Sequence, residues 1–535
     1  MKSITSKVPV TVKQATFDLL RSLDMTTVFG NPGSTELAFL HEWPNDFRYI
    51  LGLQEASVLG MADGYAQASG RAAFVNLHSA AGLGNALGNL FTAYRNHTPL
   101  VITAGQQARS LLPFAPYLGA ERATEFPRPY VKWACEPARP EDVPAAIAEA
   151  WHVAMQKPCG PTFVSIPSDD WGARTMPIAP RQAARDFAPD PAMLAELAAA
   201  LATSRRPALV VGAAVDRDGA FDLAVSLAER MGADVWEAPT ASRASFPEDH
   251  PRFAGFLPAI PEKLSERLTG YDLILVLGAP VFTFHVPGVA DILASGVPIY
   301  QIVDDPAAAA RAPATTSLLG TMALSIRALL GVLPEAGRMA PSQSVRASAP
   351  IIAPSVPISI EFAMQSLAGL LPPDLPIVEE APSHRPAVQR FLPIRQAGGF
   401  YTMASGGLGY GLPAAIGVAL AKGRRTVCLT GDGSAMYSFQ SLWTAVQERL
   451  PVTVVILNNG GYGAMRAFSK IMQSEDPPGI DLPGIDFVSL AAGFGCAGIR
   501  VSDPSALSSA MAASLDRDGP YLIEIEIDPD TGAVY

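Results

Sequence analysis

An isolated carboxylate, Asp432, stands between two glycines in GDGS at 431–434, and the amide pair Asn458-Asn459 follows that GDG after 24 residues. A carboxylate and an amide oxygen suit a hard cation such as Mg²⁺, which shares its other coordination positions with phosphates and water. The glycines would let backbone N–H groups approach phosphate oxygens, and Ser434 with a following helix would add donors. Either segment alone fits an ordinary loop equally well, but both in this order favour a site for a metal ion and a diphosphate.

Two expected strands must position these groups. The segments 425–430 (RTVCLT) and 452–459 (VTVVILNN) are typical of buried strands, and 438–450 between them has a helical pattern. A right-handed crossover leaves the ends of both strands at the same edge of a parallel sheet. Ligands of open α/β sheets bind at that edge. We therefore expect Asp432 and Asn459 to lie close together.

The same alternation of apolar runs and helical patterns extends along the whole chain and is typical of parallel sheets with crossover helices. Two segments rich in proline, alanine and serine, 175–193 and 334–358, interrupt it and are typical of linkers. The sequence therefore predicts an α/β fold with three doubly wound parallel-sheet domains, at 1–180, 190–335 and 355–535. The first and third domains have a similar rhythm of elements.

The composition of the 535-residue chain argues against several classes of function. The net charge is −11 and basic residues do not cluster, so nucleic acid is not expected as the main partner. No apolar run approaches the ~18 residues of a membrane span, and the first residues lack an apolar signal core, so no membrane association is expected. The four cysteines are far apart and lack metal-ligand spacing. We therefore expect reduced thiols and a cytoplasmic location.

Longer segments carry a more specific resemblance than the GDG and NN pair. The chain resembles the thiamine diphosphate-dependent 2-keto acid decarboxylases, above all the benzoylformate decarboxylases, in segments that include VFGNPGSTELAFL (28–40), NLHSAAGLGNALG (76–88) and GGLGYGLPAAIGV (406–418). The resemblance implies thiamine diphosphate and Mg²⁺ as cofactors, with Ca²⁺ able to replace Mg²⁺, and pyrimidine-binding, middle and diphosphate-binding domains. The implied reaction is non-oxidative decarboxylation of an aromatic or bulky 2-keto acid, benzoylformate to benzaldehyde and CO₂, through a thiamine ylide and an enamine.

The resemblance also assigns catalytic roles to four residues near expected strand ends. Glu55 matches the glutamate that hydrogen-bonds the cofactor's pyrimidine ring, although an ordinary acid at a helix N-terminus is the alternative. His78 and His285 match proton-transfer positions, for which histidine is suited because it titrates near neutral pH. A lone histidine is nevertheless more often structural. Ser34 matches the serine that contacts the substrate carboxylate, although NPGS also fits a turn with a helix N-cap.

The resemblance also implies cofactor contacts in the third domain, where SGGLGYG (405–411) matches the segment under the bent cofactor. Leu408 would be the apolar wedge under the bent cofactor, and the Gly406 carbonyl would accept a hydrogen bond from its amino group. Gly461 would offer a backbone carbonyl to the metal ion beside Asp432 and Asn459. Besides Asn459, the other expected cofactor contacts are Ser383, Gly433, Ser434 and Tyr462.

The residues that differ from the family's pattern lie in segments expected to form the substrate pocket. Thr402 and Met403 stand where benzoylformate decarboxylases carry an aromatic residue and a cysteine, and Pro382 replaces a small hydroxyl residue. His384 is either a pocket residue or, the reading we favour, a polar residue in the first turn of a helix. The other expected pocket residues remain apolar, which suits an aryl or branched substrate: Leu118, Ala464, Met465 and Phe468.

The resemblance further implies that each cofactor binds between the first domain of one subunit and the third domain of another. Glu55 and Asp432 of one site would then come from different chains of a dimer or tetramer. Two other functions stay open. A carboligase of the acetolactate synthase type, or a flavin-linked oxidase, would use the middle domain for a flavin, but the sequence has no clear nucleotide fingerprint there. A non-catalytic thiamine-fold binding protein is disfavoured because Glu55, Asp432 and Asn459 are all retained.

Overall fold

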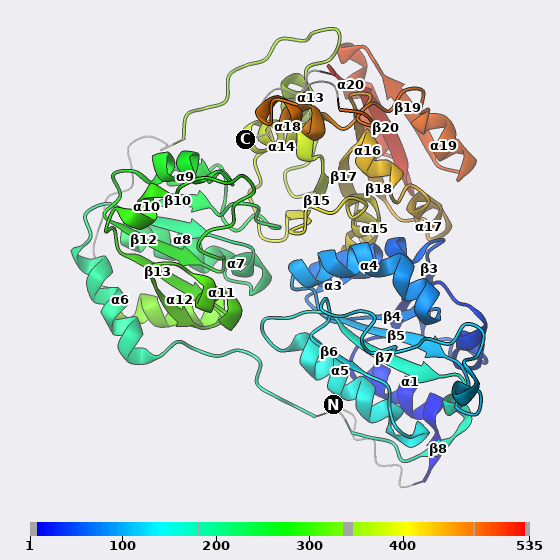
Figure 1. Ribbon diagram of the computed structural model, residues 1–535. Coiled ribbons are helices and arrows are strands. Elements are labelled where there is room, and N and C mark those ends of the chain that lie inside the picture. Colours follow the sequence, from blue (N-terminus) through cyan, green and yellow to red (C-terminus); the bar gives the residue numbers. More distant parts are fainter. Residues whose placement is uncertain (1–7, 180, 335–345, 475–476, 530–535) are drawn as a thin grey trace.

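Three sheets of six parallel strands organise the chain in the computed structural model, which describes residues 8–179, 181–334, 346–474 and 477–529 (Figure 1). Helices connect successive strands, so the predicted α/β fold with three parallel-sheet domains is confirmed. Strands such as β12, with the sequence LILVL, are buried along their whole length, as expected for strands covered on both faces. Among the described residues, no helix has both the length and the apolar character that crossing a membrane requires.

The N-terminal domain is built on a sheet with the strand order β3-β2-β4-β5-β7-β6. Its strands are β2 (Thr27–Gly30), β3 (Arg48–Leu51), β4 (Ala73–Leu77), β5 (Leu100–Gln106), β6 (Trp133–Cys135) and β7 (Thr162–Pro167). Its helices are α1 (Val12–Ser22), α2 (Leu37–Leu40), α3 (Glu55–Ser69), α4 (Ser79–Arg95) and α5 (Val143–Met155). A short antiparallel pair, β1 (Val10–Thr11) and β8 (Arg174–Thr175), lies outside this sheet.

The middle domain has the strand order β11-β10-β9-β12-β13-β14, which is common among nucleotide-binding folds. Its strands are β9 (Pro207–Val211), β10 (Asp234–Glu237), β11 (Phe253–Phe256), β12 (Leu273–Leu277), β13 (Ile299–Val303) and β14 (Thr315–Leu319). Its helices are α6 (Pro191–Thr203), α7 (Ala214–Arg217), α8 (Phe221–Met231), α9 (Pro261–Leu268), α10 (Asp291–Ala294), α11 (Pro306–Arg311) and α12 (Met322–Val332).

The C-terminal domain has the strand order β16-β15-β17-β18-β20-β19. Its strands are β15 (Ile377–Glu380), β16 (Phe400–Thr402), β17 (Thr426–Gly431), β18 (Val452–Asn458), β19 (Ala497–Val501) and β20 (Tyr521–Glu526). Its helices are α13 (Ile360–Leu370), α14 (Arg385–Phe391), α15 (Gly411–Lys422), α16 (Asp432–Met436), α17 (Ser441–Gln447), α18 (Gly463–Ile471), α19 (Phe487–Gly493) and α20 (Leu507–Leu515). When strands are counted from the first in each sheet, this order equals that of the N-terminal domain.

Both predicted linkers lie between sheets. The stretch after β8 reaches α6 without a further strand or helix among its described residues, and the stretch after α12 leads to α13. Parts of the predictions lie outside the described residues: position 180, 335–345, and the chain ends 1–7 and 530–535. The limits of the three domains at 1–180, 190–335 and 355–535 stay predictions.

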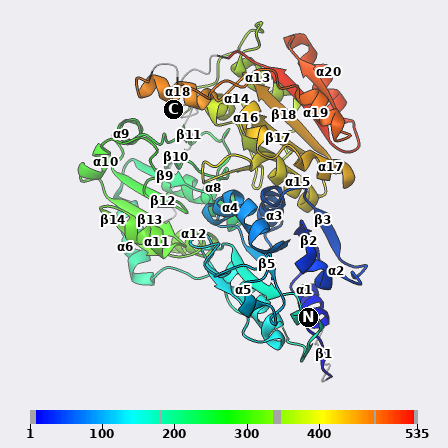
Figure 2. The ribbon, with the colours of Figure 1, turned by 45° about the vertical axis from the view of Figure 1, so that its right-hand side comes forward.

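The N-terminal and C-terminal domains pack against each other through α3 and α15 (Figure 2). Glycines make this contact possible, because their backbones touch the facing helix. A Cβ on Gly64 would lie 2.1 Å from the Ala414 carbonyl oxygen, and one on Gly417 would lie 2.0 Å from the Met61 carbonyl oxygen. Side chains of both helices belong to one hydrophobic core, so these two domains form a continuous unit within the chain.

Candidate active site

Neighbouring strands of the C-terminal sheet end where the metal site was predicted. Strands β17 and β18 are adjacent and parallel, and Gly431 at the end of one pairs with Leu457 of the other. Asp432 therefore begins α16 beside the loop that follows β18. The structure brings Asp432 and Asn459 together: the Asn459 amide oxygen lies 3.2 Å from Asp432 Oδ1.

Three oxygen-bearing groups converge at this point. The Asp432 carboxylate is 2% exposed and accepts N–H bonds from Gly433 and Gly461, both at 2.8 Å. The Asn459 amide also lies 2.7 Å from the Gly461 carbonyl oxygen. Oxygen ligands of an octahedral Mg²⁺ lie about 2.9 Å apart, because Mg–O bonds measure about 2.0–2.1 Å. The donor set therefore fits a small hard cation, because the Asn459 amide oxygen already faces the other two oxygens.

The electrostatics of the site agree with that fit. Burial raises the pKa of Asp432 above its usual value, so an adjacent cation would stabilise the charged carboxylate. The described part of the chain holds no group of three or more histidine, cysteine or acidic side chains that could bind a metal. A site with one carboxylate, an amide and a backbone carbonyl leaves positions for phosphate oxygens, as is usual for Mg²⁺.

Arg466 on α18 fixes the loop that carries two of these groups. Its guanidinium donates to the carbonyl oxygens of Asn459 at 3.2 Å and Gly460 at 3.1 Å. It also forms an ion pair with Asp481 at 2.7 Å. The loop between β18 and α18 is therefore held by a charged side chain of the helix that follows it.

The groups predicted to contact the diphosphate surround the same point. The Ser383 hydroxyl accepts the Ala464 N–H at 2.8 Å, at the start of α18. A Cβ on Gly433 would lie 2.5 Å from the ring of Tyr462, so glycine is needed for this ring to pack on the first turn of α16. Ser434 is the next residue of that turn and is buried. These residues line the same cavity as Asp432, where they could contact an anion.

A buried glutamate holds the glycine-rich loop that precedes α15. Glu380 accepts the N–H of Gly409 at 2.5 Å and the N–H of Gly411, and burial raises its pKa to about 8. Gly406 has φ +74°, a conformation that favours glycine. Leu408 lies between Gly406 and Gly409, and its partly buried side chain packs against the hydrophobic core. We did not predict Glu380 from the sequence, because its partners are about 30 residues away.

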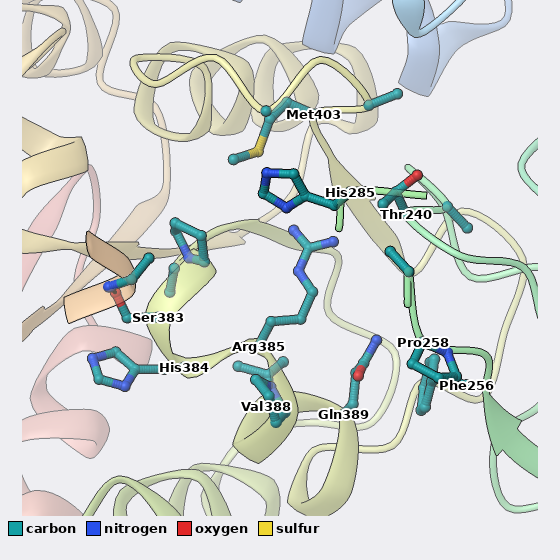
Figure 3. Close-up of a pocket in the computed structure, with 18 of the residues that line it drawn as sticks. Thr240, Phe256, Pro258, His285, Ser383, His384, Arg385, Val388, Gln389 and Met403 are labelled. Carbon is teal, nitrogen blue, oxygen red and sulfur yellow. Dashed lines mark hydrogen bonds between the residues drawn. The ribbon is translucent and has the colours of Figure 1, made fainter. Parts of the chain in front are cut away.

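A cavity of about 1300 Å³ extends from this sheet edge to the middle domain. His285, in the loop that follows β12, lies 4.9 Å from Phe468 between ring centroids. Figure 3 shows its ring between Met403 and the guanidinium of Arg385. The predicted residues that line the cavity are His285, Ser383, Met403, Gly406, Leu408, Asp432, Gly433, Ser434, Asn459, Gly461, Tyr462, Ala464, Met465 and Phe468.

Thr402 and His384 differ from the expectations for them. Thr402 is fully buried and does not line the cavity; its hydroxyl lies 2.8 Å from the Glu379 carbonyl oxygen and 2.6 Å from Arg385 Nη2. Its neighbour Met403 lines the cavity instead, because successive residues of an extended chain point to opposite sides. His384 immediately precedes α14 and also lines the cavity, and burial lowers its pKa to about 4.

The N-terminal sheet carries a second group of predicted residues at its own strand ends. Glu55 begins α3, and its carboxylate accepts a hydrogen bond from Asn85 of α4 at 3.0 Å. His78 precedes α4. A Cβ on Gly82 would lie 3.2 Å from Glu55 Oε1 and 3.5 Å from His78 Cβ, so these two side chains flank the same glycine.

The His78 ring is oriented by a buried carboxylate. His78 Nδ1 lies 2.9 Å from Glu36 Oε2, and Glu36 is 1% exposed. Glu36 also accepts the N–H groups of Gly33 at 2.8 Å and Gly105 at 3.0 Å. Because a carboxylate only accepts, the proton of neutral His78 is placed on Nδ1, which leaves Nε2 as the acceptor. The sequence signal for Glu36 is its capping-box spacing to Gly33, which we did not use.

Ser34 and Leu118 belong to this second group. Ser34 is exposed at the start of the 3₁₀ turn Ser34–Glu36, next to the residues that hold His78. The Ser79 hydroxyl donates to the Leu118 carbonyl oxygen at 2.6 Å, which places Leu118 beside the start of α4. Neither residue lines the cavity beside Asp432 in the same chain.

Within one chain the two groups of predicted residues do not line a common cavity, although their domains are in contact. The C-terminal part of α4 contacts the cofactor-site loop, with the Thr92 and Ser405 hydroxyls 2.9 Å apart. Asn89 of the same helix donates to the carbonyl oxygens of Ala56 at 2.7 Å and Gly409 at 3.2 Å, so the first turn of α3 lies near this loop. Glu55 itself does not line the cavity beside Asp432.

The fold and the site define a class of protein that comparisons with known families identify. Family models for the thiamine pyrophosphate enzymes match three segments: the N-terminal TPP binding domain at 10–124, the central domain at 194–329 and the C-terminal TPP binding domain at 381–525. Thiamine pyrophosphate is a synonym of thiamine diphosphate. The chain belongs to the thiamine diphosphate-dependent enzyme family, and thiamine diphosphate is its cofactor.

Individual relatives are similar over nearly the whole chain. Benzoylformate decarboxylase of Pseudomonas aeruginosa is 45% identical over 520 residues, covering 96% of this chain and 98% of that protein. The crystal structure of benzoylformate decarboxylase from Polynucleobacter necessarius superposes with a TM-score of 0.94 at 40% identity, covering 97% and 99% of the two chains. The 4-hydroxybenzoylformate decarboxylase of Rhodococcus jostii RHA1 superposes with a TM-score of 0.94 at 41% identity, covering 98% and 100%.

Proposed function

We propose that this chain catalyses the non-oxidative decarboxylation of an aromatic 2-keto acid, converting benzoylformate to benzaldehyde and CO₂. The observation that carries the proposal is the 45% identity to the Pseudomonas aeruginosa benzoylformate decarboxylase, which extends over nearly the full length of both proteins. The cavity supports it, because Met403 and Phe468 give the wall around His285 an apolar surface that suits an aryl group.

The residues present fit the cofactor and a divalent ion. Asp432, Asn459 and the Gly461 carbonyl would bind Mg²⁺, and the same oxygen donors would accept Ca²⁺. Gly433 and Ser434 would contact the diphosphate, with Ser383 and Tyr462 beside them. When bound, thiamine diphosphate supplies a nucleophilic carbon and a ring that accepts the electrons released with CO₂.

The chain's own groups would position the cofactor and the substrate and move protons. Glu55 would hydrogen-bond the pyrimidine ring, the Gly406 carbonyl would accept from the amino group on that ring, and Leu408 would support the bent conformation. Ser34 would hold the substrate carboxylate. His78, through its Nε2, and His285, which lines the cavity beside Asp432, would accept and return protons.

A complete site requires two copies of the chain. Glu55, His78 and Ser34 do not line the cavity that holds Asp432 of the same chain. We propose that the N-terminal group of one subunit faces the cavity of another, with a dimer as the smallest active form and a tetramer as a larger one. Specific activity should then fall when dilution dissociates the subunits, as followed by analytical ultracentrifugation.

The test is benzaldehyde release from benzoylformate, measured by chromatography after removal and re-addition of thiamine diphosphate and Mg²⁺. Release that depends on both would support the proposal. Bound cofactor without benzaldehyde would contradict it. Formation of an acyloin or a 2-hydroxy-2-keto product in place of the aldehyde would indicate a carboligase.

A further inference from the structure

Arg385 is a positively charged residue of the cavity to which none of the predicted catalytic or cofactor-binding roles is assigned. It is the first residue of α14, its side chain is 23% exposed, and it lines the cavity. Figure 3 shows its guanidinium pointing toward His285 and Met403. Ser383 lies two residues earlier and is directed elsewhere, to the Ala464 N–H beside the predicted diphosphate site.

One edge of the guanidinium is already occupied. Arg385 Nη2 donates to the Glu379 carboxylate and, at 2.6 Å, to the Thr402 hydroxyl. Glu379 is 0% exposed and fixed in place, because its other oxygen accepts the Ala381 N–H at 2.6 Å. The charge of Arg385 is therefore balanced by a buried carboxylate that cannot turn away.

Two of the three guanidinium nitrogens, Nε and Nη1, remain available. An arginine carries five N–H donors, and the bonds to Glu379 and Thr402 both use Nη2. Among the described residues, Nε and Nη1 have no hydrogen-bond partner, and neither atom is fully buried, so both are still accessible to a ligand in the cavity although the side chain is only 23% exposed. The neighbouring wall is apolar at Met403 and Phe468, so an aryl group packed there would cover these donors.

A substrate that covers the Arg385 guanidinium without offering it a hydrogen-bond acceptor would bind unfavourably. A buried donor left unpaired loses its interaction with water and gains nothing in return. For this reason, sites built to donate hydrogen bonds discriminate strongly against substrate analogues that lack the matching atom. A second carboxylate would also be disfavoured here, because it would lie near the fixed negative charge of Glu379.

We propose that Arg385 determines substrate specificity by donating a hydrogen bond to a neutral oxygen substituent, such as a phenol or ether oxygen, on the aryl group of the 2-keto acid. The inference rests on the proposed function and refines it. It predicts that the preferred substrate is an oxygen-substituted benzoylformate and that benzoylformate itself is a poorer one.

The first test compares substrates of matched shape with the wild-type holoenzyme. In 4-methoxybenzoylformate an ether oxygen stands where 4-ethylbenzoylformate has a methylene group, and the 3-substituted pair covers the other ring position. For at least one pair we expect kcat/KM to favour the methoxy compound by about 10-fold or more, the size of one hydrogen bond from a charged donor. Equal values for both pairs, or a preference for 4-carboxybenzoylformate, would overturn the inference.

The second test removes the donor. Arg385→Met alone would leave the Glu379 carboxylate buried without a partner, so the double variant Glu379→Gln/Arg385→Met is used instead. A second variant, Arg385→Lys, keeps the positive charge but loses the forked geometry of the guanidinium. We expect the methoxy-to-ethyl ratio of kcat/KM to approach one in the double variant and to fall in Arg385→Lys. The matched control is Arg390→Met on the same helix, because Arg390 is exposed and does not line the cavity.

Titration with thiamine diphosphate distinguishes a role of Arg385 in substrate specificity from a role in cofactor binding. Thiamine diphosphate binding, followed by tryptophan fluorescence with Mg²⁺ present, should be retained in Arg385→Lys. Weakened cofactor binding with an unchanged substrate ratio would mean that Arg385 binds the diphosphate, and would overturn the inference. If no benzoylformate is turned over at all, the proposed function fails and this inference with it; turnover with a ratio of one in the wild type refutes only the inference.

Discussion

Replacing Asp432 with asparagine tests the metal site without relying on turnover. The carboxylate accepts two backbone N–H bonds, from Gly433 and Gly461, both at 2.8 Å. The asparagine oxygen can keep one of them, and its amide nitrogen then faces the other N–H. An unpaired buried donor costs about 1–3 kcal/mol, and removal of a buried charge offsets part of that cost. Without ligands we therefore expect the free energy of unfolding to change by less than about 2 kcal/mol.

The response to ligands should change much more. Thiamine diphosphate with Mg²⁺ at 100 times the Kd stabilises the folded state by about 2.7 kcal/mol, whereas 100-fold weaker binding at the same concentration leaves about 0.4 kcal/mol. For domains of 150–250 residues, the larger value corresponds to a rise in Tm of roughly 5–10 °C and the smaller to about 1 °C. Asp432→Asn should therefore lose most of the ligand-induced rise in Tm.

Thermal unfolding in EDTA, with thiamine diphosphate alone, and with thiamine diphosphate and MgCl₂ measures this difference. Asp374→Asn is the matched control, because Asp374 is 56% exposed, pairs with Arg424 and does not line the cavity. It should retain the full rise. If Asp432→Asn keeps the wild-type response to cofactor and metal, Asp432 is not the metal ligand and the assignment of the C-terminal strand ends is wrong.

Three further predictions concern the acidic side chains Glu55, Glu36 and Glu380. Glu55→Gln should lower kcat by about 100-fold or more, the size of one general acid–base contribution, while the ligand-induced rise in Tm persists; full turnover would exclude the proposed role. Glu36→Gln should lower the free energy of unfolding in urea by about 1–3 kcal/mol, because in either orientation its amide nitrogen faces the N–H of Gly33 or Gly105; an unchanged midpoint would refute this. The pKa of Glu380 is about 8 in the folded chain against an ordinary 4.5, so its stabilising contribution is complete below pH 4.5 and is lost as pH rises to about 8. Urea titrations across that range should find a steeper loss in the wild type than in Glu380→Gln.

Local signals were sufficient for the strand ends and the glycine turns. Asp432 and Asn459 were predicted to meet because a parallel crossover places consecutive strand ends at one edge, and the two residues do lie together. The three-sheet architecture followed from continuous apolar runs such as those of β12 and β18. These features depend on short segments and on general rules of chain topology, which a single sequence contains.

Other features depend on contacts between distant segments. Glu36 accepts an N–H from Gly105, 69 residues away, and Glu380 accepts N–H groups from Gly409 and Gly411. An isolated acid in the sequence gives no indication of such partners. Thr402 was expected in the pocket together with Met403, although adjacent residues of an extended segment face opposite sides, and only Met403 lines the cavity.

The division of the site follows from the fold. The N-terminal and C-terminal sheets have the same strand order, and each presents functional groups at the carboxyl ends of its strands. The N-terminal edge carries Glu55 and His78, which we propose hold or move protons, whereas the C-terminal edge carries Asp432 and its loop, which suit a metal ion and an anion. Within one chain, Glu55 and His78 do not line the cavity that holds Asp432. In the proposed dimer, the N-terminal edge of each chain would meet the C-terminal edge of its partner and complete the site.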